Sequence, residues 1–217
     1  MRNQLNEELD ELRHDILAMG SLVEEALRKA LHALKTGDAA LAKDVRRGDA
    51  EIDALRLGID DRAAMLIATQ QPVAGNLREL VTVFKLTDNL ERIGDHAAHL
   101  AKTARRLADD PYPLPLDRLE RMAAAGVAMV HDAVEAYLRR DEALAREAAA
   151  KDDEIDAEHK AFLREVLAYL AGRPDKAEQA TKLIATSSFL ERLGDHVTNL
   201  CEAVVFMLTG AHAELND

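Results

Sequence analysis

Pairs of acidic residues four positions apart are the feature of this sequence best suited to chemistry. Four such pairs lie in predicted helices: Asp49 with Asp53, Glu91 with Asp95, Asp152 with Asp156, and Glu191 with Asp195. At this spacing two side chains share one helix face, with Cβ atoms about 5–6 Å apart. Like charges repel there by roughly 0.2–0.5 kcal/mol per pair, and a bound cation would reverse that cost. The pairs therefore predict metal-binding faces.

These acids lie beside the apolar stripes of their helices. At about 100° per residue, Glu91 points about 130° away from the core direction midway between Leu90 and Ile93. Similar arithmetic places Asp53 outside the stripe that contains Ile52. Two adjacent helices of this kind would line one open groove with four carboxylates. Such oxygen ligands suit Mg, Mn, Ca or iron, and carboxylates also accept zinc.

A solvated helix face is the ordinary explanation of one acidic pair, because 31% of the residues are charged. Four pairs at matched positions favour metal binding instead. His96 and His196 each follow an aspartate by one residue, about 100° off the acidic face, so we expect them to support the site rather than ligate. Gly94 and Gly194 lie inside helices at a cost of about 1 kcal/mol each, which a close neighbouring helix or a ligand would justify.

Long helices are the elements that must position these acids. The first carries an apolar seam with alternating spacings of four and three: Leu5, Leu9, Leu12, Ile16, Met19 and Val23. Asp38 is expected to cap a second helix that ends near Thr69. Asn76 and Glu79 resemble a capping box that opens a third helix, which reaches about Ala108.

The second half of the chain repeats this plan. Residues 90–96 match residues 190–196 at six of seven positions, and residues 51–54 match 154–157 at a shift of 103. Asp141 is expected to cap a helix that ends at Gly172. Three prolines in the segment 109–115 forbid helix and mark the boundary. We therefore predict an all-α fold of two tandem, pseudo-repeated three-helix bundles with six long helices. Their bounds are residues 1–110 and 116–217.

Composition narrows the classes of partner. The formal charge of −12 follows from 28 basic and 40 acidic residues, and it disfavours binding to nucleic acid or to anionic lipid. No stretch approaches the roughly 18 apolar residues of a membrane span, and the chain begins without an apolar signal region. The single cysteine, Cys201, cannot form an internal disulfide. We expect a soluble, cytoplasmic protein without membrane insertion.

On these residues the sequence resembles the PhoU family of phosphate-uptake regulators. The resemblance spans the whole chain. It rests on the duplicated layout, on residues 90–96 and their copy at 190–196, and on the segments 48–53 and 70–74. It implies a cytoplasmic homodimer that holds multinuclear metal clusters, of iron or zinc in known members, on the four acidic pairs.

Family members extend the motif with an asparagine and an acid, which match Asn199 and Glu202 here. Their first-half counterparts are His99 and Lys102. A protonated lysine cannot ligate a metal ion. We therefore predict that the first cluster binds fewer metal ions, or binds them more weakly, than the second.

The resemblance also implies a regulatory role without catalysis. Members damp the phosphate-starvation sensor histidine kinase and act with the ATPase subunit of the high-affinity phosphate ABC transporter. A carboxylate-metal enzyme, such as a phosphatase or oxidase, is the alternative from another class, and a purely structural scaffold is a third. An enzyme would need a general base or nucleophile in a dry, shaped cavity, and the predicted groove is open.

Overall fold

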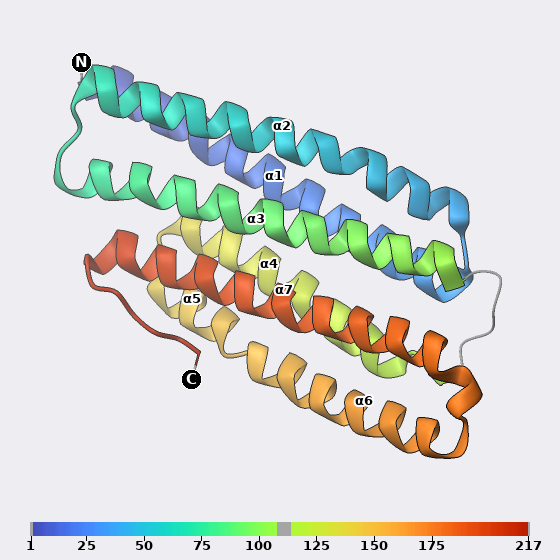
Figure 1. Cartoon of the computed structure of the whole chain (residues 1–217). Coiled ribbons are helices and arrows are strands. Elements are labelled where there is room, and N and C mark those ends of the chain that lie inside the picture. The colour runs from blue at the N-terminus through green and yellow to red at the C-terminus, as the bar shows by residue number, and fades with distance from the viewer. Residues whose placement is uncertain (1, 108–113, 217) are drawn as a thin grey trace.

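Helices make up almost all of the described chain, which comprises residues 2–107 and 114–216 of a computed structural model (Figure 1). The elements are α1 (Arg2–Thr36), α2 (Ala39–Gln70), α3 (Ala74–Leu107), α4 (Asp117–Arg139), α5 (Glu142–Ala149), α6 (Asp152–Gly172), the short 3-10 helix η1 (Pro174–Lys176) and α7 (Ala177–Thr209). Those two ranges contain no strand, so the all-α prediction is confirmed. Most of the predicted linker, residues 109–113, lies outside the described residues.

The apolar seams predicted from the sequence form the core. All six seam residues of α1, from Leu5 to Val23, are buried. The predicted caps also form. The Asp38 carboxylate accepts hydrogen bonds from the amides of Ala40 and Leu41, both at 2.9 Å. The Asp141 carboxylate accepts one from the amide of Leu144 at 3.1 Å. Each cap satisfies amides that the first helical turn leaves without partners.

The predicted start of the third helix was wrong. Helix α3 begins at Ala74, so Asn76 lies inside the first turn and is not its cap. Gln71 and Ala74 both have positive φ angles, of 47° and 49°, and they reverse the chain before the predicted start. Glu79, expected as the second member of a capping box, is instead buried at 1% exposure.

The second half differs from the predicted plan at one helix. A single helix was expected from Asp141 to Gly172, but the chain breaks at residues 150–151 into α5 and α6. The break places Asp152 at the first position of α6, whereas its counterpart Asp49 lies inside α2, about three turns from its start. Carboxylates are favoured at a helix N-terminus because the unpaired amides there carry partial positive charge.

Figure 1 shows the two halves stacked along their lengths. Helices α1, α2 and α3 pack together, as do α4, α5, α6 and α7. Across the halves α3 packs on α7 and α1 packs on α4, which leaves α2 at one edge and the α5–α6 pair at the other. The buried side chains form one continuous cluster. None of the described helices is long and apolar enough to cross a bilayer.

A buried carboxylate joins the halves. Glu79 on α3 accepts a hydrogen bond from Arg13 Nε of α1 at 2.7 Å and another from Arg140 Nη1, at the end of α4, at 2.9 Å. Tyr137 is buried nearby, and burial, followed by the charge of Glu79, raises the pKa of its hydroxyl. Because Arg13 and Arg140 belong to different halves, one acid fixes their relative position.

Replacing Glu79 by glutamine should therefore destabilise the protein. Losing one member of a buried ion pair costs about 3–5 kcal/mol, and we expect roughly 1–3 kcal/mol here because both arginines reach solvent. Urea unfolding would measure the change. Glu25→Gln removes an acid of the exposed Lys29–Glu25 pair and should cost about 0.5 kcal/mol or less. Equal effects of the two substitutions would contradict a clamping role for Glu79.

Candidate functional site

The first set of predicted ligands lies along the α2–α3 contact. Burial raises the pKa of Asp49, and the negative charges of Asp95 and Asp53 raise it further. The pKa of Glu91 is raised by burial and then by Asp95 and Asp53. Such mutual effects require proximity. The charges of Asp53 and Asp95 thus act on both Asp49 and Glu91 across the α2–α3 contact.

Glu91 has unused acceptor capacity. Its side chain is 15% exposed, and its buried Oε2 accepts no hydrogen bond. The nearest cations are Arg92 Nε, 3.6 Å from Oε2, and Arg56 Nη1, 3.9 Å from Oε1. Arg92 also lies 3.5 Å from Asp95 of the same helix, so it balances charge at the surface of α3.

Two glycines allow this close arrangement. A Cβ atom at Gly94 would lie 3.1 Å from Ile52 Cδ1 and 3.8 Å from Asp49 Oδ1. In the second half a Cβ at Gly194 would collide with Asp152 Oδ1. Of the two explanations that the sequence left open, a close helix or a ligand, the structure shows a close neighbouring helix at both glycines, and in each half an aspartate lies over the glycine.

The second set is centred on Asp152, which is only 4% exposed. Its Oδ1 is buried without a hydrogen-bond partner, and its Oδ2 accepts a hydrogen bond from Asn216 Nδ2 at 2.7 Å. Burial raises the pKa of Asp152 to about 6; the Asn216 bond opposes this rise, whereas Asp195, Asp156 and Glu191 add to it.

Glu191 shows the same pattern, because its pKa is raised by burial and then by Asp195 and Asp156. Lys160 Nζ donates to Asp156 Oδ2 at 2.7 Å. The four acids of the second half therefore also lie together, on the α6–α7 contact.

Acidic side chains that lie near one another do not by themselves form a metal-coordination site. Among residues 2–107 and 114–216 no three His, Cys, Asp or Glu side chains are arranged to hold an ion. The donors nevertheless fit a cation, because each set offers clustered carboxylates with a buried, unpaired oxygen. Side-chain rotation would be needed to bring the oxygens onto one ion. Their assignment as metal ligands stays a prediction.

Asn199 and Glu202 have different surroundings. Both line a groove of about 690 Å³ between α3 and α7, together with Lys85 and Asn89. Glu202 Oε1 accepts a hydrogen bond from the amide of Leu215 at 2.9 Å.

Histidines meet in the seam between the halves, which the sequence analysis did not predict. The ring of His96 lies 5.5 Å from that of His196 and 6.5 Å from that of His99. Neither ring nitrogen of His96 has a hydrogen-bond partner, and burial, followed by the two other histidines, lowers its pKa to about 4. His196 Nδ1 lies 3.0 Å from Asn89 Oδ1. The 100-residue repeat was the available signal, because it places His96 and His196 at equivalent positions.

The two glycines should differ in their tolerance of alanine. Gly94→Ala meets the flexible end of Ile52, and alanine's higher helix propensity of about 1 kcal/mol offsets the contact. Gly194→Ala displaces the buried Asp152 carboxylate and should cost about 1–3 kcal/mol. Thermal unfolding would measure both. Adding Asp152→Ala should recover most of the Gly194→Ala loss; no recovery would contradict the contact as its cause.

Asp152→Asn should stabilise metal-free protein at pH 7.5. The raised pKa of about 6, against the usual 3.8, means that the folded state binds more protons between these values. The charged, buried Asp152 therefore lowers the free energy of unfolding, fully so above pH 6. This loss becomes smaller as the pH falls through 6 and the carboxyl group takes up its proton. We expect a gain on the order of 2 kcal/mol at pH 7.5 that shrinks toward pH 4. Urea unfolding of chelator-treated protein would measure it, with the exposed Asp153→Asn as control. A gain independent of pH would contradict the prediction.

Comparisons with known proteins agree with this architecture. A family model described as PhoU domain matches residues 16–104 and 119–204, one match in each half. A "Phosphate-specific transport system accessory protein PhoU homolog" of Clostridium acetobutylicum is 33% identical over 100% of this chain and 99% of its own length. A homologue of the same description from Pseudomonas putida is 36% identical, over 95% of this chain and 81% of its own.

Solved structures give the same result. The crystal structure of PhoU from Pseudomonas aeruginosa matches with a TM-score of 0.91 and 34% identity, over 95% of this chain and 99% of that one. The phosphate transport system regulatory protein PhoU from Streptococcus pneumoniae matches with a TM-score of 0.89 and 29% identity, over 97% and 99%. Sequence and fold agree across both halves, and the chain belongs to the PhoU family.

Proposed function

We propose that this chain is a metal-binding regulator of phosphate uptake, an accessory protein of a phosphate-specific transport system. The names of its relatives support the transport role. The observation that carries the metal-binding role is the matched pair of acidic sets, each with an aspartate held over a helix glycine and one buried carboxylate oxygen unpaired.

Each set would hold its own cluster. The first would use Asp49, Asp53, Glu91 and Asp95; the second would use Asp152, Asp156, Glu191 and Asp195, with Asn199 and Glu202 as further ligands. Iron or zinc fits the proposal best, and Mg, Mn or Ca also accepts such oxygens. A bound ion would neutralise carboxylates whose burial, followed by the charges of the neighbouring acids, raises the pKa values of Asp49 and Asp152.

The proposed partners follow from the transport role. As an adaptor in the cytoplasm, the protein would damp a phosphate-responsive sensor histidine kinase and contact the ATPase subunit of the phosphate ABC transporter. We propose that it does so as a homodimer. Regulation through contacts needs no reaction at the metal, whose task would be to order the acidic faces.

A carboxylate-metal phosphatase or oxidase receives no specific support. Asp53 and Asp195 are exposed on open helix faces, whereas metal-assisted hydrolysis requires a dry, shaped cavity. Metal-dependent phosphoester hydrolysis by purified protein, lost in Asp195→Ala, would favour the enzyme over the adaptor.

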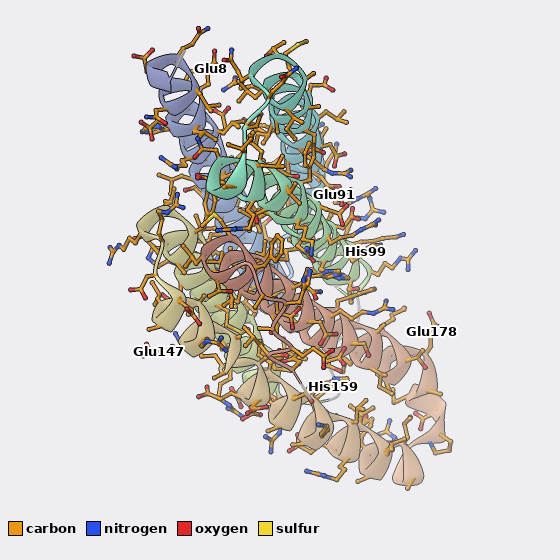
Figure 2. The ribbon with its side chains drawn as sticks, turned by 90° about the vertical axis from the view of Figure 1, so that its left-hand side faces the viewer. Glu8, Glu91, His99, Glu147, His159 and Glu178 are labelled. Carbon is orange, nitrogen blue, oxygen red and sulfur yellow. The ribbon has the colours of Figure 1, made fainter. Side chains whose placement is uncertain are left out.

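Metal binding can be tested with Glu91→Ala and Glu191→Ala. Because Lys102 stands where the second half has Glu202, we expect the second cluster to hold more metal, so Glu191→Ala should lose more of it. Elemental analysis and calorimetric titration of chelator-treated protein would measure the loss. Glu147→Ala is the control, since Figure 2 places Glu147 on α5, across the molecule from Glu91. Equal losses would contradict the asymmetry, and metal-free protein whose melting is unchanged by added metal would contradict metal binding.

A further inference from the structure

The segment after α7 is docked against the body of the protein. Gly210 ends α7 with a φ of 78°, and its amide donates to the Phe206 carbonyl at 2.8 Å. The chain then turns back, as Figure 1 shows at the C-terminal end. The His212 ring stacks on Phe206 with centroids 4.6 Å apart, and Leu215 packs against the core. Residues 210–216 therefore have a defined position.

This segment delivers one hydrogen-bond donor to Asp152 of the second acidic set and another to Glu202, which lines the groove between α3 and α7. The amide of Leu215 donates to Glu202 Oε1 at 2.9 Å, and Asn216 Nδ2 donates to Asp152 Oδ2 at 2.7 Å. Both acceptors are predicted metal ligands. Each N–H group thus places partial positive charge on a carboxylate oxygen that a cation would otherwise use.

A cation and these donors cannot share the same lone pairs. An ion held by both oxygens of Asp152 would use Oδ2 as well as the unpaired Oδ1, and it would repel the Asn216 amide hydrogens at Oδ2. With an ion bound, the Asn216 side chain could stay only if its amide oxygen turned toward the ion. Without an ion, that orientation would place the Asn216 amide oxygen against the Asp152 carboxylate oxygen. Asp152 is only 4% exposed, and the residue that donates to its Oδ2, Asn216, is itself exposed.

The first set lacks the matching acceptor. Glu202 corresponds to Lys102, whose ammonium group can donate but not accept a hydrogen bond. A contact like that of Leu215 with Glu202 therefore has no carboxylate to accept it at position 102.

We propose that residues 210–216 form a built-in competitor for the cation at the second acidic set, displaced from Asp152 and Glu202 when an ion binds. The inference rests on the proposed metal-binding function. Displacement would also move His212 and Ala213 away from the groove between α3 and α7, which they line. Ion binding at the second set is thereby coupled to the shape of the surface between the halves.

The affinity test uses a Glu91→Ala, Asp95→Ala background, in which Zn²⁺ titration of chelator-treated protein reports on the second set. Asn216→Ala should tighten Zn²⁺ binding about three- to tenfold, because a hydrogen bond to a charged group no longer competes. Glu214→Gln changes an exposed residue of the same segment and should stay within about twofold. Unchanged affinity in Asn216→Ala would overturn the proposal.

Hydrogen exchange measured by mass spectrometry gives a second readout. Zn²⁺ should speed exchange in a peptide containing residues 211–216, as the Leu215 amide loses its partner. Slower exchange would mean that Asn216 ligates the ion, and unchanged exchange would mean that the segment does not respond; either result overturns the proposal while metal binding stands. If Zn²⁺ binds neither the parent protein nor Asn216→Ala, the metal-binding function itself fails.

Discussion

The close approach of acid-bearing helices at two glycines is the constraint on which the site depends. Gly94 and Gly194 contribute no side chain of their own, so Ile52 and Asp49 of α2 lie against the first glycine and Asp152 of α6 lies against the second. This packing confines negative charge at partly buried positions, which costs free energy without a compensating ion. The chain carries this electrostatic cost twice, once in each half.

The two halves use this constraint differently. Asp49 comes from inside a continuous helix, whereas Asp152 begins a new helix after a break, is more deeply buried, and is engaged by the C-terminal segment. Duplication thus produced equivalent acids in unequal environments. Where the two halves meet, His96 lies next to His196, so equivalent residues of the repeat are in contact there.

Periodic features could be predicted from the sequence, and local departures from periodicity could not. The α1 seam, the Asp38 cap and the acids near Gly94 follow from spacing, because helical geometry fixes which residues share a face. The start of α3 and the break at residues 150–151 depend on backbone conformations that no residue type there demands. The burial of Glu79 depends on arginines distant in sequence, and the Asn216 contact depends on where the chain folds back. Whether side chains close around an ion is decided by rotamers, which spacing does not specify.

The single shared core has a consequence for the history of the protein. An ancestral unit able to stand alone would have needed a polar outer surface on α3, yet in this chain that surface is covered by α7 and its Glu79 is neutralised by an arginine of the other copy. Each copy therefore depends on the other to cover part of its core. Either copy alone would expose an apolar flank, and the first copy would leave Glu79 without Arg140, one of its two counter-charges.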